Sequence, residues 1–234
     1  MNKNNHFFLI LIFSLLSSLF YSQNNNKNCT NDSIKYCLTE FIINKKKPTI
    51  LFLLEEGISP EDNYKITNIL NKLKFNCITV EMPLSKLDTS NSVYFQQREN
   101  CIRDAIDLVS KKTKQKLIIL ASKINSSIVL KISDTNSELI KSIICFSPQN
   151  KVGDYSLSNN LKSNTKMPFI YCSLKEREAI DVFLQNLNNK RTYRQFSGVG
   201  MSGFNILLGK SDCAAEIWSD LSNTLKIIAR TNRE

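Results

Sequence analysis

The residues best suited to covalent chemistry in this sequence lie directly after the apolar run 117–121. Ser122 and Ser126 flank Lys123 there, and a serine hydroxyl with a lysine base is a known arrangement for attack on esters or amides. The more usual base is histidine, and the only histidine of the chain is His6. Histidine chemistry therefore depends on whether the segment that carries His6 belongs to the working protein.

Residues 1–22 have the layout of an export signal. Lys3 supplies a positive start, an apolar run extends over 7–20, and Ser22 offers a small residue for cleavage. The run falls short of the ~20 apolar residues that a membrane span needs, so we expect cleavage, with a retained amino-terminal anchor as the alternative. A polar leader, 23–33, follows. We expect an exported protein, in the bacterial periplasm first and secreted second, whose mature chain has no imidazole and no membrane span.

The charge of the chain is strongly basic. The formal net charge is +10, and lysines gather in two segments, 45–47 and 111–116. An excess of this size favours anionic partners. No aromatic residues interleave with either segment as a stacking platform for nucleic acid would require, so nucleic acid is not expected as a partner. Solvated loop lysines are the preferred interpretation of both segments.

The seven cysteines all follow the expected signal. An odd number leaves at least one of them outside any disulfide within the chain. Cys29 and Cys37 are the pair that we expect to bridge, whereas Cys77, Cys145 and Cys172 stand in apolar runs and should be buried thiols. The cysteine spacings lack a zinc-binding pattern, and no metal or other cofactor is expected.

Strand-like and helix-like segments alternate along the chain, which predicts an α/β fold: one domain with a mainly parallel sheet and helices on both faces. The run 117–121 is wholly apolar, as in a central parallel strand. Ser59 and Pro60 are typical of a helix start. The runs 34–43 and 48–54 predict a hairpin that enters the sheet. The other expected strands are 75–82, 140–146, 168–172 and 192–196, and the later helices are expected near 94–110, 125–133, 176–187 and 211–228.

This order of elements resembles that of the α/β-hydrolase superfamily over residues 34–230. The segment 192–205, which reads TYRQFSGVGMSGFN, and the Trp218 helix after it are similar to a bacterial branch of exported hydrolase-like proteins of unknown function. The resemblance implies an oxyanion loop after the first core strand and a nucleophile on a sharp turn after a central strand. It also implies an acid after a late strand and a histidine before the last helix.

The first two of these positions carry the wrong chemistry for a serine hydrolase. The oxyanion loop reads Glu55-Glu56-Gly57, and carboxylates oppose the negative charge that such a loop stabilises. We expect both acids to face solvent. Lys123 falls where the nucleophilic serine belongs, on a turn that lacks the two usual glycines. We expect a solvated lysine there.

The other two positions also depart from the pattern. Glu176 is the carboxylate nearest to the acid position, and its place at a helix start is explained by the helix dipole alone. The loop 198–203 occupies the histidine position, where Met201 or Ser202 stands and neither can accept a proton as imidazole does. A histidine-based triad is therefore excluded once the signal is removed.

Two functions remain. In the preferred one, a non-catalytic exported protein binds a polar or charged ligand, or an envelope protein, in the crevice at the carboxyl ends of the strands. The residues expected to line this crevice are Glu55, Glu56, Lys123, Ser147, Ser173 and Ser202. In the alternative, a serine hydrolase of esters or amides uses Ser122 or Ser126 as nucleophile with Lys123 as base and Glu176 as the acid. A third class, a binder of anionic surfaces, has only the net charge in its favour.

Overall fold

The structure of the chain is a computed structural model. The structure describes residues 27–29, 36–55, 57–82, 92–133, 135–149, 151–152, 155–156, 168–185, 192–196, 201–209 and 212–231. The expected signal, most of the polar leader, Glu56 and the first part of the 198–203 loop lie outside the described residues. None of the helices in these ranges is long and apolar enough to cross a membrane.

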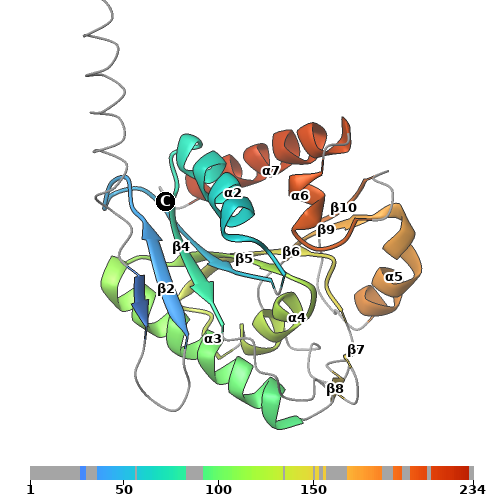
Figure 1. The fold of residues 1–234 in the computed structure, drawn as a ribbon, viewed down its shortest axis with the longest axis horizontal. Helices are drawn as coiled ribbons and strands as arrows, with labels where there is room; N and C mark the ends of the chain where they lie inside the picture. The colour runs from blue at the N-terminus through green and yellow to red at the C-terminus, as the bar shows by residue number, and fades with distance from the viewer. Residues whose placement is uncertain are drawn as a thin grey trace, which may run out of the picture.

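An eight-stranded, mainly parallel sheet forms the centre of the protein (Figure 1). Its strands, in spatial order, are β1 (Lys27–Cys29), β2 (Cys37–Phe41), β4 (Asn76–Glu81), β3 (Thr49–Leu53), β5 (Leu117–Ser122), β6 (Ile140–Phe146), β9 (Phe169–Ser173) and β10 (Thr192–Phe196). Neighbouring strands from β4 to β10 are parallel, and β1 and β2 are antiparallel to their neighbours. The predicted α/β class with a mainly parallel sheet is confirmed.

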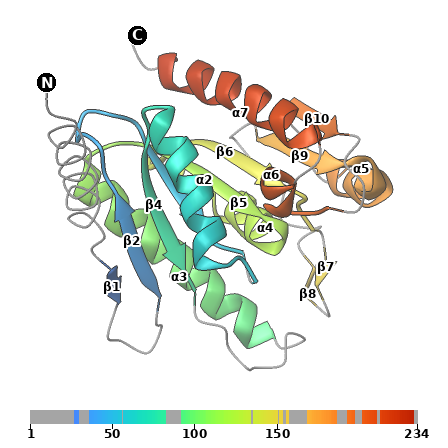
Figure 2. The same ribbon diagram turned by 45° about the horizontal axis from the view of Figure 1, so that its top comes forward.

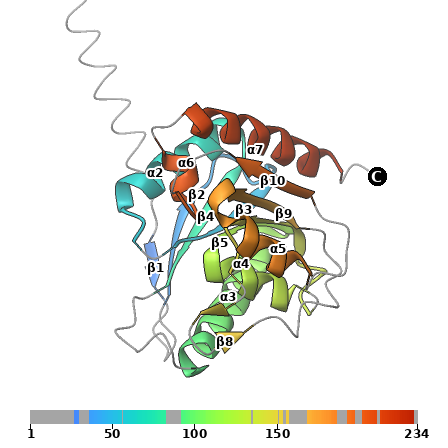
Figure 3. The ribbon, with the colours of Figure 1, turned by 90° about the vertical axis from the view of Figure 1, so that its right-hand side faces the viewer.

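Helices cover both faces of this sheet (Figures 2 and 3). The helices on one face are α2 (Pro60–Lys72), α6 (Asn205–Leu208) and α7 (Asp212–Arg230), and those on the other are α3 (Ser92–Thr113), α4 (Lys123–Ile132) and α5 (Arg177–Gln185). Strand side chains alternate between the two layers: Ile50 and Phe52 pack with the first group, and Leu51 and Leu53 with the second. Continuous apolar strands follow from this burial on both faces.

The predicted hairpin at the start of the sheet is wrong, because β4 lies between β2 and β3. The connection crosses the start of β4, where Asn76 holds it. The Asn76 side chain accepts hydrogen bonds from the backbone N–H groups of Ile43 and Asn44, and it donates to the carbonyls of Asn44 and Lys47, at 2.8–3.2 Å. Because β4 lies between β2 and β3, this buried strand has backbone hydrogen-bonding partners on both sides.

The start of α2 agrees with the sequence prediction more closely than the strand pairing does. Ser59 caps α2 through a 3.1 Å hydrogen bond from Asp62 N, and Pro60 occupies the first turn. The predicted helix at 176–187 is present as α5, and a 3₁₀ turn, η1 (Leu174–Glu176), precedes it. The short helix α6 and a two-stranded ribbon of β7 (Lys151–Val152) and β8 (Tyr155–Ser156) were not expected. The ribbon lies in the polar loop after β6.

One disulfide is present at the antiparallel edge. Cys37 is disulfide-bonded, and Cys29 faces it across the β1–β2 pair. The five other cysteines are thiols, which leaves Cys29 as the partner and agrees with the predicted bridge. Cys77, Cys145 and Cys172 are buried, as expected.

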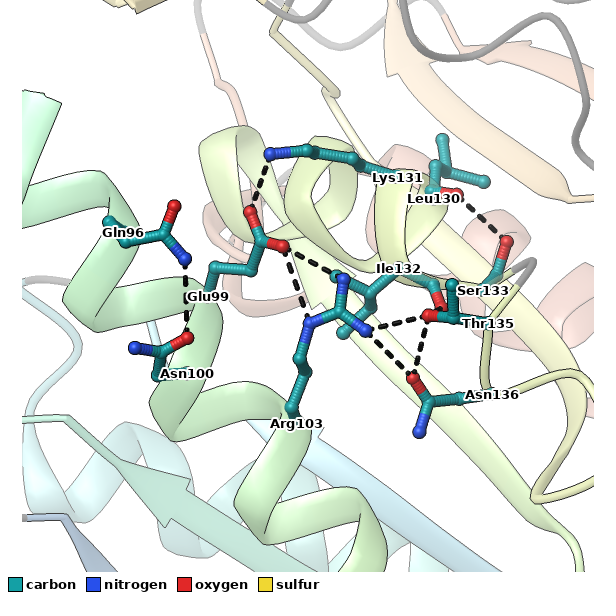
Figure 4. Close-up of polar contacts among 10 residues, drawn as sticks. All are labelled: Gln96, Glu99, Asn100, Arg103, Leu130, Lys131, Ile132, Ser133, Thr135 and Asn136. Carbon is teal, nitrogen blue, oxygen red and sulfur yellow. Dashed lines mark hydrogen bonds and ion pairs between the residues drawn. The ribbon is translucent and has the colours of Figure 1, made fainter.

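A buried carboxylate joins α3 to α4 (Figure 4). Glu99 on α3 accepts hydrogen bonds from Lys131 on α4 at 2.6 Å and from Arg103 at 2.8 Å. Arg103 in turn donates to Thr135 and Asn136 after α4, at 2.6 and 3.1 Å. Burial raises the pKa of Glu99, but the two cationic donors outweigh it and hold the pKa below its ordinary value of 4.5.

We expect Glu99→Gln to lower the free energy of unfolding by about 2 kcal/mol at neutral pH, because charge-assisted hydrogen bonds are lost. Since the folded pKa is lowered, this contribution is complete above the ordinary pKa and disappears as the pH falls through the folded value. Urea unfolding across a pH series measures both effects. Glu138, an exposed acid between α4 and β6, is changed to Gln as the control. If the stability of the Glu99→Gln protein and of the unchanged protein depended equally on pH, the charged contacts of Glu99 would contribute nothing to stability.

Candidate functional site

The turn from β5 into α4 carries Lys123 at its apex. β5 ends at Ser122 and α4 begins at Lys123, whose φ of 47° lies in the left-handed region. A non-glycine residue in that conformation is strained, and such strain is common at functional turns. The structure therefore places Lys123 on the sharp strand-to-helix turn, at the position that the hydrolase resemblance assigns to the nucleophile.

Glu55, just beyond β3, is buried rather than solvent-facing, so the expectation of a loop acid is wrong. It is 8% exposed, and its carboxylate forms an ion pair with the Lys123 ammonium. The same carboxylate accepts hydrogen bonds from Ser122 Oγ at 2.8 Å and from Phe204 N at 3.0 Å. These partners offset the cost of burying the charge. The Lys123 side chain is 32% exposed, so it is only partly solvated.

Gly203 lies directly against this carboxylate. Its φ is +60°, and a Cβ added there would come within 2.9 Å of Glu55 Cδ and closer still to Oε2. Only a residue without a side chain fits this close approach. The loop that the resemblance assigns to a histidine is thus packed onto the Glu55 carboxylate at Gly203 and Phe204.

A second acid holds the same loop from the other side. Glu176 Oε2 accepts hydrogen bonds from Ser147 Oγ at 2.8 Å and from Ser173 N at 2.9 Å. Ser147 Oγ also accepts a 2.8 Å hydrogen bond from Gly203 N. Ser173 and Glu176 form a capping box at the start of η1, which confirms the helix-start role expected for Glu176. The structure therefore brings Ser147, Ser173 and Glu176 together.

Neither candidate serine has the surroundings of an exposed nucleophile. Ser122 is 1% exposed and donates its proton to Glu55. Ser126 is fully buried, and its Oγ lies against the Cys145 thiol with no hydrogen-bond partner of ordinary geometry among the described residues. Burial raises the pKa of Cys145 to about 12, so this thiol is inert at neutral pH.

A buried arginine, Arg98, supports the turn through Asn125, and the sequence motifs did not point to it. Arg98 Nε donates to Asn125 Oδ1 at 2.6 Å, and Asn125 Nδ2 donates to the Leu54 carbonyl at 3.2 Å. Arg98 also bonds to the hydroxyl of Tyr94, one turn earlier on α3. The sequence did contain a signal for this contact: Arg98 interrupts the apolar stripe of its helix.

The remaining predicted residues are less closely involved. Ser202 is partly exposed beside Gly203, and Met201 packs against the α2–α7 layer of the core. Glu56 lies outside the described residues. In the part of the chain that the structure describes, no group of three or more His, Cys, Asp or Glu side chains is arranged to hold a metal ion.

The fold is similar to several solved hydrolase structures. A sugar hydrolase from Lactococcus lactis matches at TM-score 0.66 and 12% identity, over 87% of this chain and 100% of that one. A hyperthermophilic esterase from the archaeon Pyrobaculum calidifontis matches at TM-score 0.67 and 11% identity, over 88% and 84%. An α/β-hydrolase enzyme from a Medee basin deep-sea metagenome matches at TM-score 0.61 and 14% identity, over 88% and 99%.

At the level of sequence, no family model matches the chain. No curated protein matches it either. The likeness therefore concerns the fold, and it covers most of the chain. The protein has an α/β-hydrolase-like fold in a single domain.

Proposed function

We propose that this chain is an exported, non-catalytic protein that keeps the hydrolase scaffold and acts by binding. The observation that carries the proposal is the ion pair between Glu55 and Lys123 at the strand-to-helix turn. An enzyme of this fold needs a nucleophile on that turn and hydrogen-bond donors beside it. Here a lysine occupies the turn, and the carboxylate of Glu55, from the loop after β3, is paired with it.

The position of Glu55 opposes catalysis through an oxyanion. An oxyanion site works by aiming free N–H or O–H donors at the negative charge that develops on the substrate. The Glu55 carboxylate stands in the loop after β3, and Ser122, Phe204 and Lys123 hold it there. A substrate oxyanion brought to this place would meet a fixed negative charge, and like charges at short range repel.

The same contacts argue against a serine–lysine pair. In such a pair the base must lie within hydrogen-bond reach of the serine hydroxyl and receive its proton. The Ser122 hydroxyl instead donates to Glu55, and the Lys123 ammonium is engaged with the same carboxylate. With the proposed removal of residues 1–22, which carry His6, the nucleophile and base positions both lack their usual groups.

The proposed binding site is the crevice at the carboxyl ends of β3, β5, β6 and β9. Lys123 is a partly exposed charge at this place, and Ser202 is a partly exposed hydroxyl on the neighbouring loop. A polar or charged ligand, or an envelope protein, is the partner that these groups suit. Ser147 and Ser173 do not line the site, because both are 2% exposed. They form hydrogen bonds to Glu176 beneath its surface.

Export to the periplasm, and membership of the bacterial branch of exported hydrolase-like proteins, are parts of the same proposal. The signal-like segment 1–22 supports export. The Cys37 disulfide also supports it, because such bonds form and persist in oxidising compartments.

The competing function is a serine hydrolase of esters or amides, and one observation favours it. The similar solved structures are described as esterases and hydrolases. In that case Ser122 or Ser126 is the nucleophile, with Lys123 as the base and Glu176 as the acid.

A fluorophosphonate probe separates the two functions. We expect no labelling of the purified protein under conditions in which a serine esterase is labelled to completion, because neither serine is both exposed and activated. Ser122→Ala and Ser126→Ala proteins should give the same background signal as the unchanged protein. Stoichiometric labelling that disappears in either variant would overturn the non-catalytic proposal and identify the nucleophile.

A further inference from the structure

The two lysine-rich segments of the sequence meet at the end of the sheet opposite the crevice. Segment 45–47 leads into β3, and segment 111–116 joins α3 to β5. Gln115 connects them, since its Nε2 donates to the Lys45 carbonyl at 2.9 Å and its Oε1 accepts from Thr49 Oγ1 at 3.5 Å. Residues some 70 positions apart in the chain therefore belong to one surface.

A cavity of about 530 Å³ opens between these segments. Three lysines line it, Lys45, Lys112 and Lys114, together with the apolar side chains of Ile42 and Ile78. The volume is in the range of small-molecule sites, and a mixture of apolar walls with a few convergent polar groups is typical of them.

The charge of this cavity is positive. Glu40 is the single carboxylate among its lining residues, and it is paired with Lys112. Lys45 and Lys114 are exposed and have no carboxylate partner among the described residues. Two ammonium groups are therefore available to a ligand without breaking an existing ion pair.

The walls of the cavity are already in place. Asn76 and Thr49 are buried, and the hydrogen-bonding groups of the Asn76 side chain are satisfied by the β2–β3 connection. Ile78 is fully buried on β4 and forms part of the core. A preformed cavity lowers the cost of ordering side chains on binding.

We propose that this cavity, which we call the lysine pocket, binds a small organic anion. The ligand has a phosphate or carboxylate head for Lys45 and Lys114 and an apolar part that packs on the partly exposed Ile42. Strand β3 separates this pocket from the crevice: its first residue, Thr49, lines the pocket, whereas its last leads to Glu55. The lysine pocket is thus a second site, independent of whether the crevice binds or catalyses.

Octyl phosphate is a suitable probe, because it joins a phosphate to a short apolar chain. In ¹H–¹⁵N NMR titrations of the purified protein below the micelle concentration, we expect saturable shifts at Lys45, Thr49 and residues 112–114. The affinity should fall as salt is added, because the lysines are exposed. 1-Octanol, which lacks the charge, should bind at least about tenfold more weakly, the equivalent of 1.4 kcal/mol.

Matched lysine variants distinguish binding at this pocket from attraction of the probe by the net charge of the protein. Lys45→Ala with Lys114→Ala should weaken octyl phosphate about tenfold. The control, Lys65→Ala with Lys72→Ala on α2, removes the same charge elsewhere and should leave the affinity unchanged. Equal weakening in both proteins, equal binding of 1-octanol, or shifts centred on Lys123 would each overturn the lysine pocket. Binding to anionic phosphatidylglycerol vesicles without binding to monomeric octyl phosphate would also overturn it.

Discussion

Glu55→Ala is expected to lower the free energy of unfolding by about 3 kcal/mol, because two buried donors lose their acceptor. Those donors are Ser122 Oγ and Phe204 N, and the ion pair with Lys123 is lost at the same time. Lys123 itself remains partly exposed, so its ammonium can turn to water and adds little to the cost. Urea unfolding followed by circular dichroism measures the change.

Two further variants locate the source of this loss. Glu55→Gln keeps an oxygen acceptor for Ser122 and Phe204, so it should cost only about 1 kcal/mol. Glu216→Ala removes an exposed acid from α7 and should change stability by less than about 0.5 kcal/mol. If Glu55→Ala were as mild as Glu216→Ala, the carboxylate would not hold the loops together.

Gly203→Ala should destabilise the protein by about 3 kcal/mol, of which the left-handed backbone accounts for about 1. The rest arises because the new methyl group overlaps the Glu55 carboxylate, which its three partners hold in place. Gly57→Ala is the matched control: its φ is also positive, at 85°, but nothing lies within 4 Å of the added Cβ. It should cost only the backbone share of about 1 kcal/mol.

The overlap also predicts a coupling between the two positions. When Glu55 is already Ala, the space beside Gly203 is open, so Gly203→Ala should then cost only its backbone share. The double variant should therefore be at least about 1 kcal/mol more stable than the sum of the single changes predicts. Strict additivity would contradict the contact between Gly203 and the carboxylate. Thermal unfolding of the four proteins completes this cycle.

Both predictions bear on the proposed loss of catalysis. In the proposed non-catalytic protein, the residues at the hydrolase positions stabilise the fold, because Glu55 joins the ends of β3 and β5 to the loop at 201–204. A carboxylate that holds these segments together cannot turn aside for a substrate oxyanion without losing its contacts. Stability measurements thus test the same contacts on which the absence of labelling depends.

Local patterns in the sequence determined most of the elements. Apolar alternation and runs placed the strands β4, β6 and β10 within a residue or so, and Ser59 with Pro60 marked the start of α2. These signals are short in range, because helix caps and side-chain periodicity depend on neighbours a few residues apart. The sequence also placed Lys123 on the turn after β5, since the register follows from the preceding apolar strand.

Strand pairing and the burial of charge were decided only by the tertiary structure. The expected hairpin was wrong because β4, which comes later in the chain, inserts between β2 and β3. Glu55 was expected in solvent, but its partners Ser122 and Phe204 lie 67 and 149 positions away. The two lysine segments are far apart in the sequence, and only the fold brings them together, through Gln115 at the end of the sheet. Contacts at such separations depend on topology, and the local sequence around each residue carries no signal of what the fold brings against it.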